Sequence, residues 1–167
     1  QNFAFIGTGW FLGIPMPVWI TIIVVVIAVV ITKKTKFGRY IYAVGGNESA
    51  ARLSGLNINK IKIWVYAIAG ILAAVGGIIL TSRLDSAQPN AGFSYELDSI
   101  AAVVIGGTSL SGGRGSIMGT VQGALIIGVL NSGLVLLNVS PFWQQIIKGF
   151  VILIAVIMDR VNHPNED

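Results

Sequence analysis

The sequence predicts an all-α protein: a polytopic transmembrane helical bundle with about five hydrophobic segments, one of them short. Runs without a charged residue cover residues 63–82 and 116–137. Such runs match the ~20 residues that cross ~30 Å of hydrocarbon at a rise of ~1.5 Å per residue. Hydrophobic residues make up 54% of the chain and charged residues only 11%, whereas soluble domains contain ~25% charged residues. We therefore expect the chain to lie in a lipid bilayer.

Five segments follow one another along the chain. Four of them are long enough to cross a bilayer or nearly so, at residues 14–32, 61–81, 116–137 and 142–158. Residues 99–110 form a weaker apolar stretch, which would extend only ~18 Å as a helix. We expect this stretch to be a re-entrant or broken helix, or part of a crossing that the following glycine-rich backbone completes.

The basic residues indicate the orientation of the chain, because cytoplasmic loops of membrane proteins carry an excess of Lys and Arg. If residues 33–60 are cytoplasmic and residues 99–110 traverse the membrane, nine of the eleven basic residues lie inside. The two exceptions are Arg83 on the outside and Lys148 within the last segment. The sequence thus predicts an external start and a cytoplasmic C-terminus.

The chain resembles part of a longer membrane protein. It starts with Gln1 and enters apolar sequence directly, without a recognisable signal peptide. An odd number of crossings that begins outside fits the second half of a larger protein. The alternative is a complete small protein with a trimmed start.

The loop of residues 33–60 is too long for a simple turn and contains a predicted short helix. Asn47 is a suitable N-cap, Glu48 suits the positive end of the helix dipole, and Gly55 is a suitable stop. The surface between them consists mostly of small residues, which suits a docking element; a helix lying on the membrane surface is the alternative. The candidate docking residues are Asn47, Glu48, Ser49, Ala50, Ala51, Arg52, Leu53, Ser54 and Gly55.

Small residues in two spans recur at the spacing that lets a neighbouring helix approach closely. We read them as helix-packing positions: Gly115, Gly119 and Gly123, and Ala69, Ala73 and Gly77. The glycine-rich run 106–115 is not a phosphate-binding loop, because Gly113 stands where that motif needs Lys. We interpret the run as flexible backbone that closes the short segment.

Polar residues inside apolar segments are the default functional candidates of a membrane protein. Lys148 and Gln144 share one face of the last segment, whereas Gln122 and Asn131 fall on opposite faces of the one before it. These four residues are candidates for a substrate path. Alternatively, Lys148 reaches the outer interface or pairs with a carboxylate, and at least one of the two amides serves helix packing. Glu96 and Asp98 precede or begin the short segment, where they favour a helix N-terminus.

Several classes of site are excluded by composition. The chain has no cysteine and a single histidine, His163, so we expect no metal site and no thiol chemistry. No nucleophile–base pair or ATP site is recognisable, and the basic residues follow membrane topology rather than forming a nucleic-acid surface. We expect a chain that is not itself an enzyme and binds no cofactor.

Three motifs carry a resemblance to a known family: G-R-Y-I-Y-A-V-G-G-N-E-S-A-A-R-L-S-G-L-N from residue 38, Y-E-L-D-S-I-A-A-V-V-I-G-G-T-S-L-S-G-G-R-G-S from residue 95, and V-S-P-F-W-Q-Q-I-I-K-G from residue 139. The chain resembles the C-terminal half of the permease subunits of bacterial ribose- and galactose-type monosaccharide ABC importers. The resemblance covers nearly the whole chain, with the motifs in the family's order.

The resemblance implies a set of partners and a location. Two permease subunits would form the pathway in the bacterial inner membrane.

 The two subunits would be identical copies, so the expected assembly is a homodimer in the lipid bilayer. Cytoplasmic ABC ATPase subunits would drive it, with residues 47–53 as the coupling helix. An external sugar-binding protein would deliver the sugar to the loop of residues 82–97, where the candidate contacts are Arg83, Asp85 and Glu96.

Two rival classes remain open. Half of an ion-coupled secondary transporter would require carboxylates inside its spans, whereas Glu96, Asp98 and Asp159 lie at segment ends. A purely structural membrane subunit would need no displayed cytoplasmic helix. The sequence does not identify the sugar.

Overall fold

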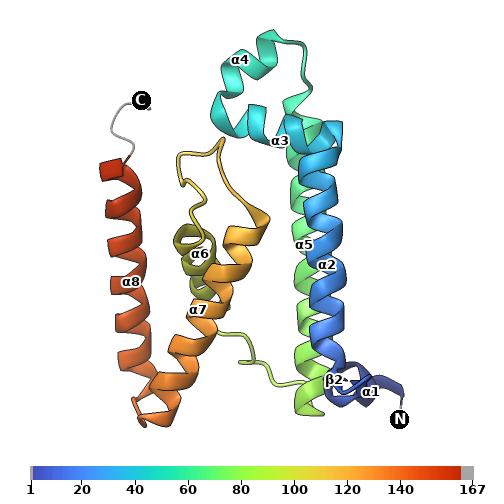
Figure 1. Ribbon diagram of the computed structural model, residues 1–167, viewed down its shortest axis with the longest axis vertical. Coiled ribbons are helices and arrows are strands. Elements are labelled where there is room, and N and C mark those ends of the chain that lie inside the picture. Colours follow the sequence, from blue (N-terminus) through green and yellow to red (C-terminus); the bar gives the residue numbers. More distant parts are fainter. Residues whose placement is uncertain (1, 163–167) are drawn as a thin grey trace. The chain divides into compact units, whose positions relative to one another are not determined.

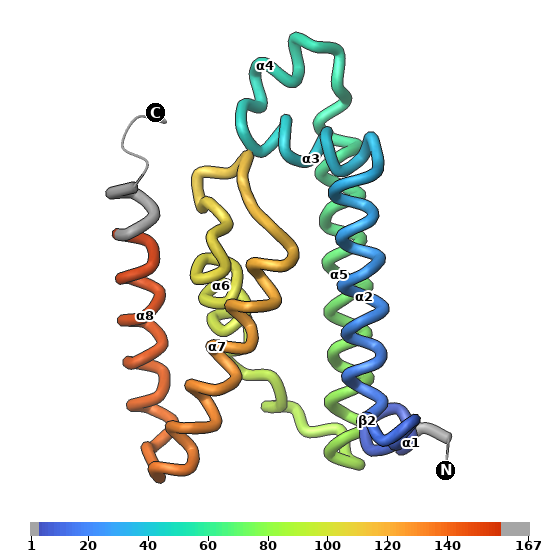
Figure 2. Tube along the Cα trace, in the orientation of Figure 1, coloured from blue at the N-terminus to red at the C-terminus, as the bar shows by residue number. Residues whose placement is uncertain are grey.

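The computed structural model describes residues 2–162 (Figures 1 and 2). The chain divides into two compact units, Gln1–Ile41 with Glu48–Phe93, and Tyr42–Asn47 with Ser94–Asp167. Every long element in the described part is an α-helix, which confirms the predicted all-α class. The predicted C-terminal tail with His163 lies outside the described residues.

The first unit opens with a small cap that the sequence did not predict. Helix α1 (Asn2–Thr8) is followed by strands β1 (Trp10–Phe11) and β2 (Ile14–Pro15), which pair antiparallel. Two residues with positive φ form the tight turn between the strands, as a hairpin of this length requires. The first apolar segment therefore begins with a hairpin and becomes helical only at Met16.

Two long helices form the body of the first unit and run in opposite directions (Figure 2). They are α2 (Met16–Lys34) and α5 (Ile58–Leu84). Helix α1 packs against both of them. The backbone N–H of Gly7 donates a 2.8 Å hydrogen bond to the buried Ser82 hydroxyl, and a Cβ at Gly7 would overlap the α5 backbone. This contact fixes α1 on the last turns of α5.

The region predicted as a loop at residues 33–60 is largely helical. It contains α3 (Lys36–Gly46), α4 (Glu48–Leu53) and the first turn of α5. Helix α3 was missed because its three glycines have poor helix propensity. Gly38 is nevertheless required there, since a Cβ would overlap the backbone of Thr32 at the end of α2.

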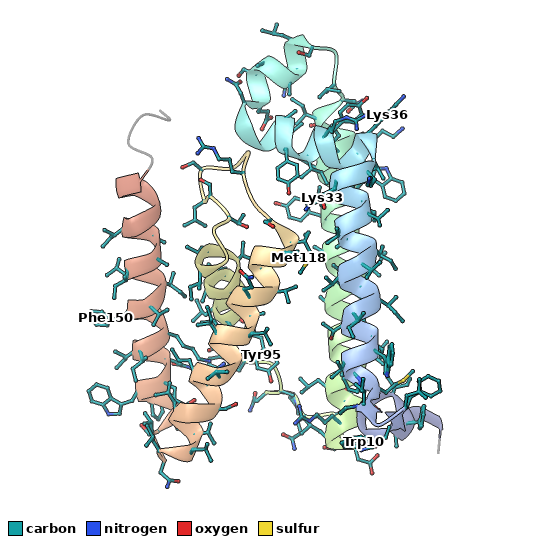
Figure 3. The ribbon with its side chains drawn as sticks, viewed as in Figure 1. Trp10, Lys33, Lys36, Tyr95, Met118 and Phe150 are labelled. Atoms are coloured by element: carbon teal, nitrogen blue, oxygen red, sulfur yellow. The ribbon has the colours of Figure 1, made fainter. Side chains whose placement is uncertain are left out.

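The second unit is built on three helices: α6 (Tyr95–Ile105), α7 (Ile117–Leu136) and α8 (Pro141–Asn162). The short helix α6 packs against both α7 and α8. Its Ala101 and Ala102 are buried together with Ile127 of α7, and Val151 and Ile152 of α8 pack against this cluster. Phe150 points away from α6 and α7 and is exposed (Figure 3).

The boundaries of the short segment differ from the prediction of residues 99–110. Helix α6 starts at Tyr95 and ends at Ile105, so it extends only ~16 Å. It stops there because Gly106 lies against Gly119 and Gly107 has a φ of +79°, outside the helical region. The segment is therefore too short to cross a bilayer as a helix, as expected.

Three helices in the described part are long and apolar enough to cross a membrane, namely α2, α5 and α7. The apolar part of α8, Pro141–Ile157, is somewhat shorter. No residue of α2 is buried, although the helix is almost entirely apolar. Because soluble proteins rarely expose such surfaces, lipid or other helices must cover it. The predicted polytopic membrane bundle is confirmed at this level.

Candidate functional site

A charged cluster lies inside the apolar second unit and joins its three helices. Lys148 of α8 approaches Asp98 of α6 with 2.8 Å between Nζ and Oδ1 and 3.1 Å between Nζ and Oδ2. Asn131 of α7 donates a 3.1 Å hydrogen bond to the same Asp98 Oδ2. Lys148 is only 9% exposed. We call Asp98, Asn131 and Lys148 the three-helix cluster.

Apolar surroundings make this cluster costly to disrupt. A buried ion without a partner loses its hydration and gains nothing in return. Asp98 supplies the negative charge that Lys148 needs, and its Oδ2 accepts hydrogen bonds from both Lys148 and Asn131. The Oδ1 atom of Asn131 is buried and has no hydrogen-bond partner among residues 2–162. That oxygen is an acceptor available to a water molecule or a substrate hydroxyl.

Two glutamines near the start of α8 form hydrogen bonds to the segments that precede α6 and α8. Gln145 donates a 3.1 Å hydrogen bond to the hydroxyl of Ser94, the buried residue that precedes α6. Gln144 donates a 2.8 Å hydrogen bond to the carbonyl of Val139, in the turn between α7 and α8. These contacts fix the first turn of α8 against its neighbours.

The four predicted path residues are only partly brought together. Asn131 and Lys148 meet through Asp98, whereas Gln144 binds the turn and Gln122 is exposed on α7. The hydrogen bond from Asn131 to Asp98 joins α7 to α6, as the expectation that an amide of α7 serves packing requires. Asp98 was predicted only as a favourable charge at a helix start. Lys148 pairs with a carboxylate, which was one of the alternatives given for it, but the sequence did not identify Asp98 as that carboxylate.

The second feature of interest is the displayed helix α4 in the first unit. It ends at Leu53, and Gly55, the predicted stop, follows with a φ of +81°. The N–H of Leu56 donates to the carbonyl of Ala51 and the N–H of Gly55 to that of Arg52, which is a Schellman motif. Glycine takes this conformation without steric strain.

Electrostatic contacts connect α4 to the start of α5. Lys62 donates a 2.6 Å hydrogen bond to Oε2 of Glu48, and Arg52 lies 3.6 Å from Oε1. The hydrogen bond from Lys62 holds the pKa of Glu48 below its ordinary value of 4.5, and the Arg52 charge acts in the same direction. Glu48 is therefore ionised at neutral pH, and it ties α4 to α5.

The burial of α4 corrects one prediction about its docking face. Ala51 is only 5% exposed and faces the protein, so it is not available for docking. Leu53 instead is 90% exposed. Ser49, Ala50, Arg52 and Ser54 are also exposed. A surface of small residues around one exposed leucine remains for a partner.

The glycine-rich run is an ordered turn in the second unit rather than flexible backbone. Ser109 donates a 3.1 Å hydrogen bond to the carbonyl of Arg114, and Tyr42 at the end of α3 donates one of 3.1 Å to the carbonyl of Gly115. A Cβ at Gly45 would lie 2.9 Å from the Gly113 nitrogen. The last turn of α3 therefore packs backbone to backbone against this turn.

The predicted glycine stripe of α7 packs against the short helix and its following turn. A Cβ at Gly119 or Gly123 would overlap the carbonyl of Gly106 or Ala102, and one at Gly115 would meet the Thr108 side chain. The role of the second row of small residues, on α5, in helix packing remains a prediction. Ala69, Ala73 and Gly77 are exposed on α5 within the described part of the chain.

The remaining predicted contacts are on the surface. Arg83 and Asp85 lie at the end of α5, where Asp85 has the left-handed φ of 50°, and Glu96 lies in the first turn of α6. All three are exposed. Among the residues the structure describes, no group of three potential metal-ligating side chains comes together.

Apolar helices of membrane-spanning length, together with a largely buried ion pair inside the apolar second unit, define a multi-pass membrane protein. Comparison with known families gives the narrower assignment. Residues 1–156 match the family described as the permease component of the branched-chain amino acid transport system, and the chain belongs to this family.

Relatives with assigned roles are similar over almost the whole chain. It is 62% identical to the ribose import permease protein RbsC of Haemophilus influenzae over 95% of this chain and 49% of that protein. Identity is 60% to the Bacillus subtilis protein of the same name, with the same coverage. It is 49% to the xylose transport system permease protein XylH of Haemophilus influenzae, over 90% of this chain and 40% of that protein. The chain thus spans about half the length of these relatives. No solved structure matches.

Proposed function

We propose that this chain is the C-terminal half of a permease subunit in an ATP-driven importer for a monosaccharide of the ribose or xylose kind. The observation that carries the proposal is the identity of 62% to a ribose import permease across nearly the whole chain. A permease subunit forms the membrane path, and a separate subunit hydrolyses ATP. The protein is accordingly a multi-pass protein of the inner membrane and not an enzyme.

We infer that α4 is the element that meets the cytoplasmic ATPase. Its exposed Leu53 offers an apolar anchor, and the small side chains beside it permit close approach. The bond between Glu48 and Lys62 holds this short helix on α5. A helix of six residues would not persist alone, so these attachments matter.

Within the second unit, contacts connect the last turn of α3 to the glycine-rich turn that precedes α7. Asn47 joins α4 to α3, and the last turn of α3 packs on the glycine-rich turn through Gly45 and Tyr42. That turn closes α6, which carries Asp98. We propose that displacement of α4 by the ATPase moves α6 through this contact. A backbone-to-backbone contact suits such transmission, because no flexible side chain absorbs the movement.

The sugar path stays a proposal, and its four candidates now differ in support. Gln122 is exposed on α7, and Asn131 has an unpartnered oxygen. Gln144 and Lys148 have structural partners that account for their positions without a sugar. We therefore rank the two residues of α7 above those of α8. Arg83, Asp85 and Glu96 remain the proposed contacts for an external binding protein, and a second identical subunit remains the proposed partner.

One observation favours a second class of transporter. Asp98 is a carboxylate packed among apolar helices, which is the feature that an ion-coupled secondary transporter uses. Its ion pair with Lys148 accounts for the position of the carboxylate without a transported ion. Uptake measurements separate the two classes.

The experiment uses proteoliposomes that contain the full-length permease and its ATPase, with sugar-binding protein outside. Vesicles loaded with ATP should accumulate ribose or xylose and continue to do so with a protonophore, whereas vesicles loaded with ADP should not. Accumulation driven by a proton or sodium gradient without ATP would contradict the proposal and support the ion-coupled class. The matched variants are Leu53→Asp in α4 and Leu137→Asp after α7, since both residues are exposed leucines. Only Leu53→Asp should lose the ATPase during purification.

A further inference from the structure

A hollow in the first unit is not used by any role described above. It lies between the start of α3, the turn after α4 and the first turns of α5, and its volume is about 450 Å³. Three aromatic side chains and two aliphatic ones contribute to its wall, along with one cation. They are Phe37, Tyr40, Trp64, Leu56, Ile61 and Lys60.

Lys60 gives this hollow a distinct chemical character. The ammonium group has no ion-pair or hydrogen-bond partner among the described residues, whereas neighbouring Lys62 pairs with Glu48. An unpaired cation beside aromatic rings is a site for an anion that carries an apolar body. The wall is too apolar for a free inorganic ion alone.

The charged residues around the hollow are mostly basic, like Lys60. Residues 33–62 contain seven basic side chains and one acidic side chain, Glu48. Lys33 and Lys36 lie where α2 ends and α3 begins (Figure 3), and both are exposed. The net positive charge draws anionic groups toward this end of the two long helices.

The level at which the hollow lies along α5 indicates what kind of ligand fits it. The hollow begins at the first turns of α5, where the apolar span starts, and Trp64 is 55% exposed. Tryptophan and tyrosine with flanking lysines mark the level of lipid headgroups. A ligand that is anionic at one end and hydrocarbon at the other fits this boundary.

We propose that this hollow binds an anionic phospholipid, with the phosphate at Lys60 and an acyl chain along Ile61 and Trp64. The site goes beyond the proposed transport function and requires only that the helices span a membrane. The lipid would cover the apolar wall and neutralise the unpaired cation. It would also hold the start of α3 against α5.

Quenching of Trp64 fluorescence tests the site in the full-length permease, with Trp64 retained as the only tryptophan. Two sets of vesicles contain equal parts of phosphatidylglycerol and phosphatidylcholine. Bromine, a short-range quencher, is placed on the acyl chains of one lipid or of the other. We expect phosphatidylglycerol to be favoured about fivefold, the ratio that one basic side chain near a membrane surface provides.

Two lysine variants distinguish a site from diffuse surface charge. Lys60→Gln should bring the ratio close to one, whereas Lys34→Gln, at an exposed residue outside the hollow, should leave it nearly unchanged. Equal quenching by the two lipids in the unaltered site would overturn the proposal. So would an equal loss of preference in both variants. If the single-tryptophan protein does not fold, native mass spectrometry of the unaltered complex makes the same comparison, through phosphatidylglycerol retained by the two lysine variants.

Discussion

At the scale of single residues, Asp98 and Lys148 form a largely buried ion pair inside the second unit. Each charge loses hydration on burial, and the ion pair compensates for that loss, with a further hydrogen bond from Asn131 to Asp98. Removing one member leaves a buried charge uncompensated. Removing both leaves neutral groups, so the effects of the two changes should not add.

Neutralising either member alone should destabilise the full-length permease by ~3–5 kcal/mol, the cost of breaking a buried ion pair. Asp98→Asn leaves the Lys148 ammonium alone, and Lys148→Met leaves the carboxylate alone. The double variant should recover much of this loss. Thermal unfolding in detergent measures the difference, and Glu96→Gln in the same turn is the exposed control, expected within ~0.5 kcal/mol. Additive losses in the double variant would show that the two residues act independently.

Acid should release α4 from α5 through Glu48. Because the pKa of Glu48 is lowered in the folded protein, its contribution is complete above the ordinary value of 4.5. The contribution falls as the pH drops through the folded pKa and the carboxylate becomes protonated. A spin label at Ser49→Cys in a cysteine-free permease should gain mobility over that acidic range.

The matched variant Glu48→Gln should be mobile at neutral pH and show no such transition. In the protein that retains Glu48, the label could instead keep the same mobility as the pH falls. That result would mean that the bond to Lys62 does not hold α4.

At the scale of elements, the short helix α6 is positioned by close contacts with α7. Gly123 is buried where α7 crosses Ala102, and a Cβ there would overlap the Ala102 carbonyl. Overpacking of this kind costs ~1–3 kcal/mol because the backbones must separate. Gly128 lies on the same helix, and apart from the nearby backbone of that helix no atom of the described residues lies within 4 Å of its Cβ position.

Gly123→Ala should therefore destabilise the permease, whereas Gly128→Ala should be neutral or slightly stabilising, by up to ~1 kcal/mol, as alanine favours helix. Thermal unfolding of the two variants measures this contrast. Equal losses would indicate that Gly128 also packs closely, against helices of the other half or of a second subunit.

The apolar segments were predictable because bilayer thickness fixes their length. The observed helices α2, α5, α7 and α8 fall within a few residues of the predicted ranges. Helix α3 was not predictable, since its glycines weaken the local signal and tertiary contacts determine the helix. Ala51 was misassigned to the docking face because sequence spacing identifies a small surface without indicating which side is covered.

At the scale of the whole molecule, the orientation in the membrane rests on the distribution of basic residues. Cysteine labelling tests it, since this chain has no native cysteine. A membrane-impermeant thiol reagent added to spheroplasts should label Ser86→Cys, in the loop after α5, and should not label Ser49→Cys in α4. Both serines are exposed, so their accessibility differs only through topology. Labelling of Ser49→Cys from outside would reverse the orientation.

The family resemblance was predictable from three motifs in order, and the family match over residues 1–156 confirms it. The three-helix cluster was only half predictable. Lys148 and Asn131 stood out as polar residues in apolar segments, but their meeting at Asp98 depends on how α6 packs between α7 and α8. Along the chain, Asn131 lies 33 residues and Lys148 lies 50 residues from Asp98, so no local sequence pattern encodes the contact.

The contact between α4 and an ATPase is the central claim, and a site-directed cross-link tests it most directly. Leu53→Cys in the full-length permease, assembled with the ATPase and the sugar-binding protein, should form a cross-link to the ATPase with a short thiol-reactive reagent. Leu137→Cys, at an exposed leucine just after α7, should form none. A cross-link from Leu53→Cys that also changes in yield when ATP is bound would agree with a coupling role. Absence of any ATPase cross-link at Leu53→Cys in a complex that still transports sugar would contradict the account.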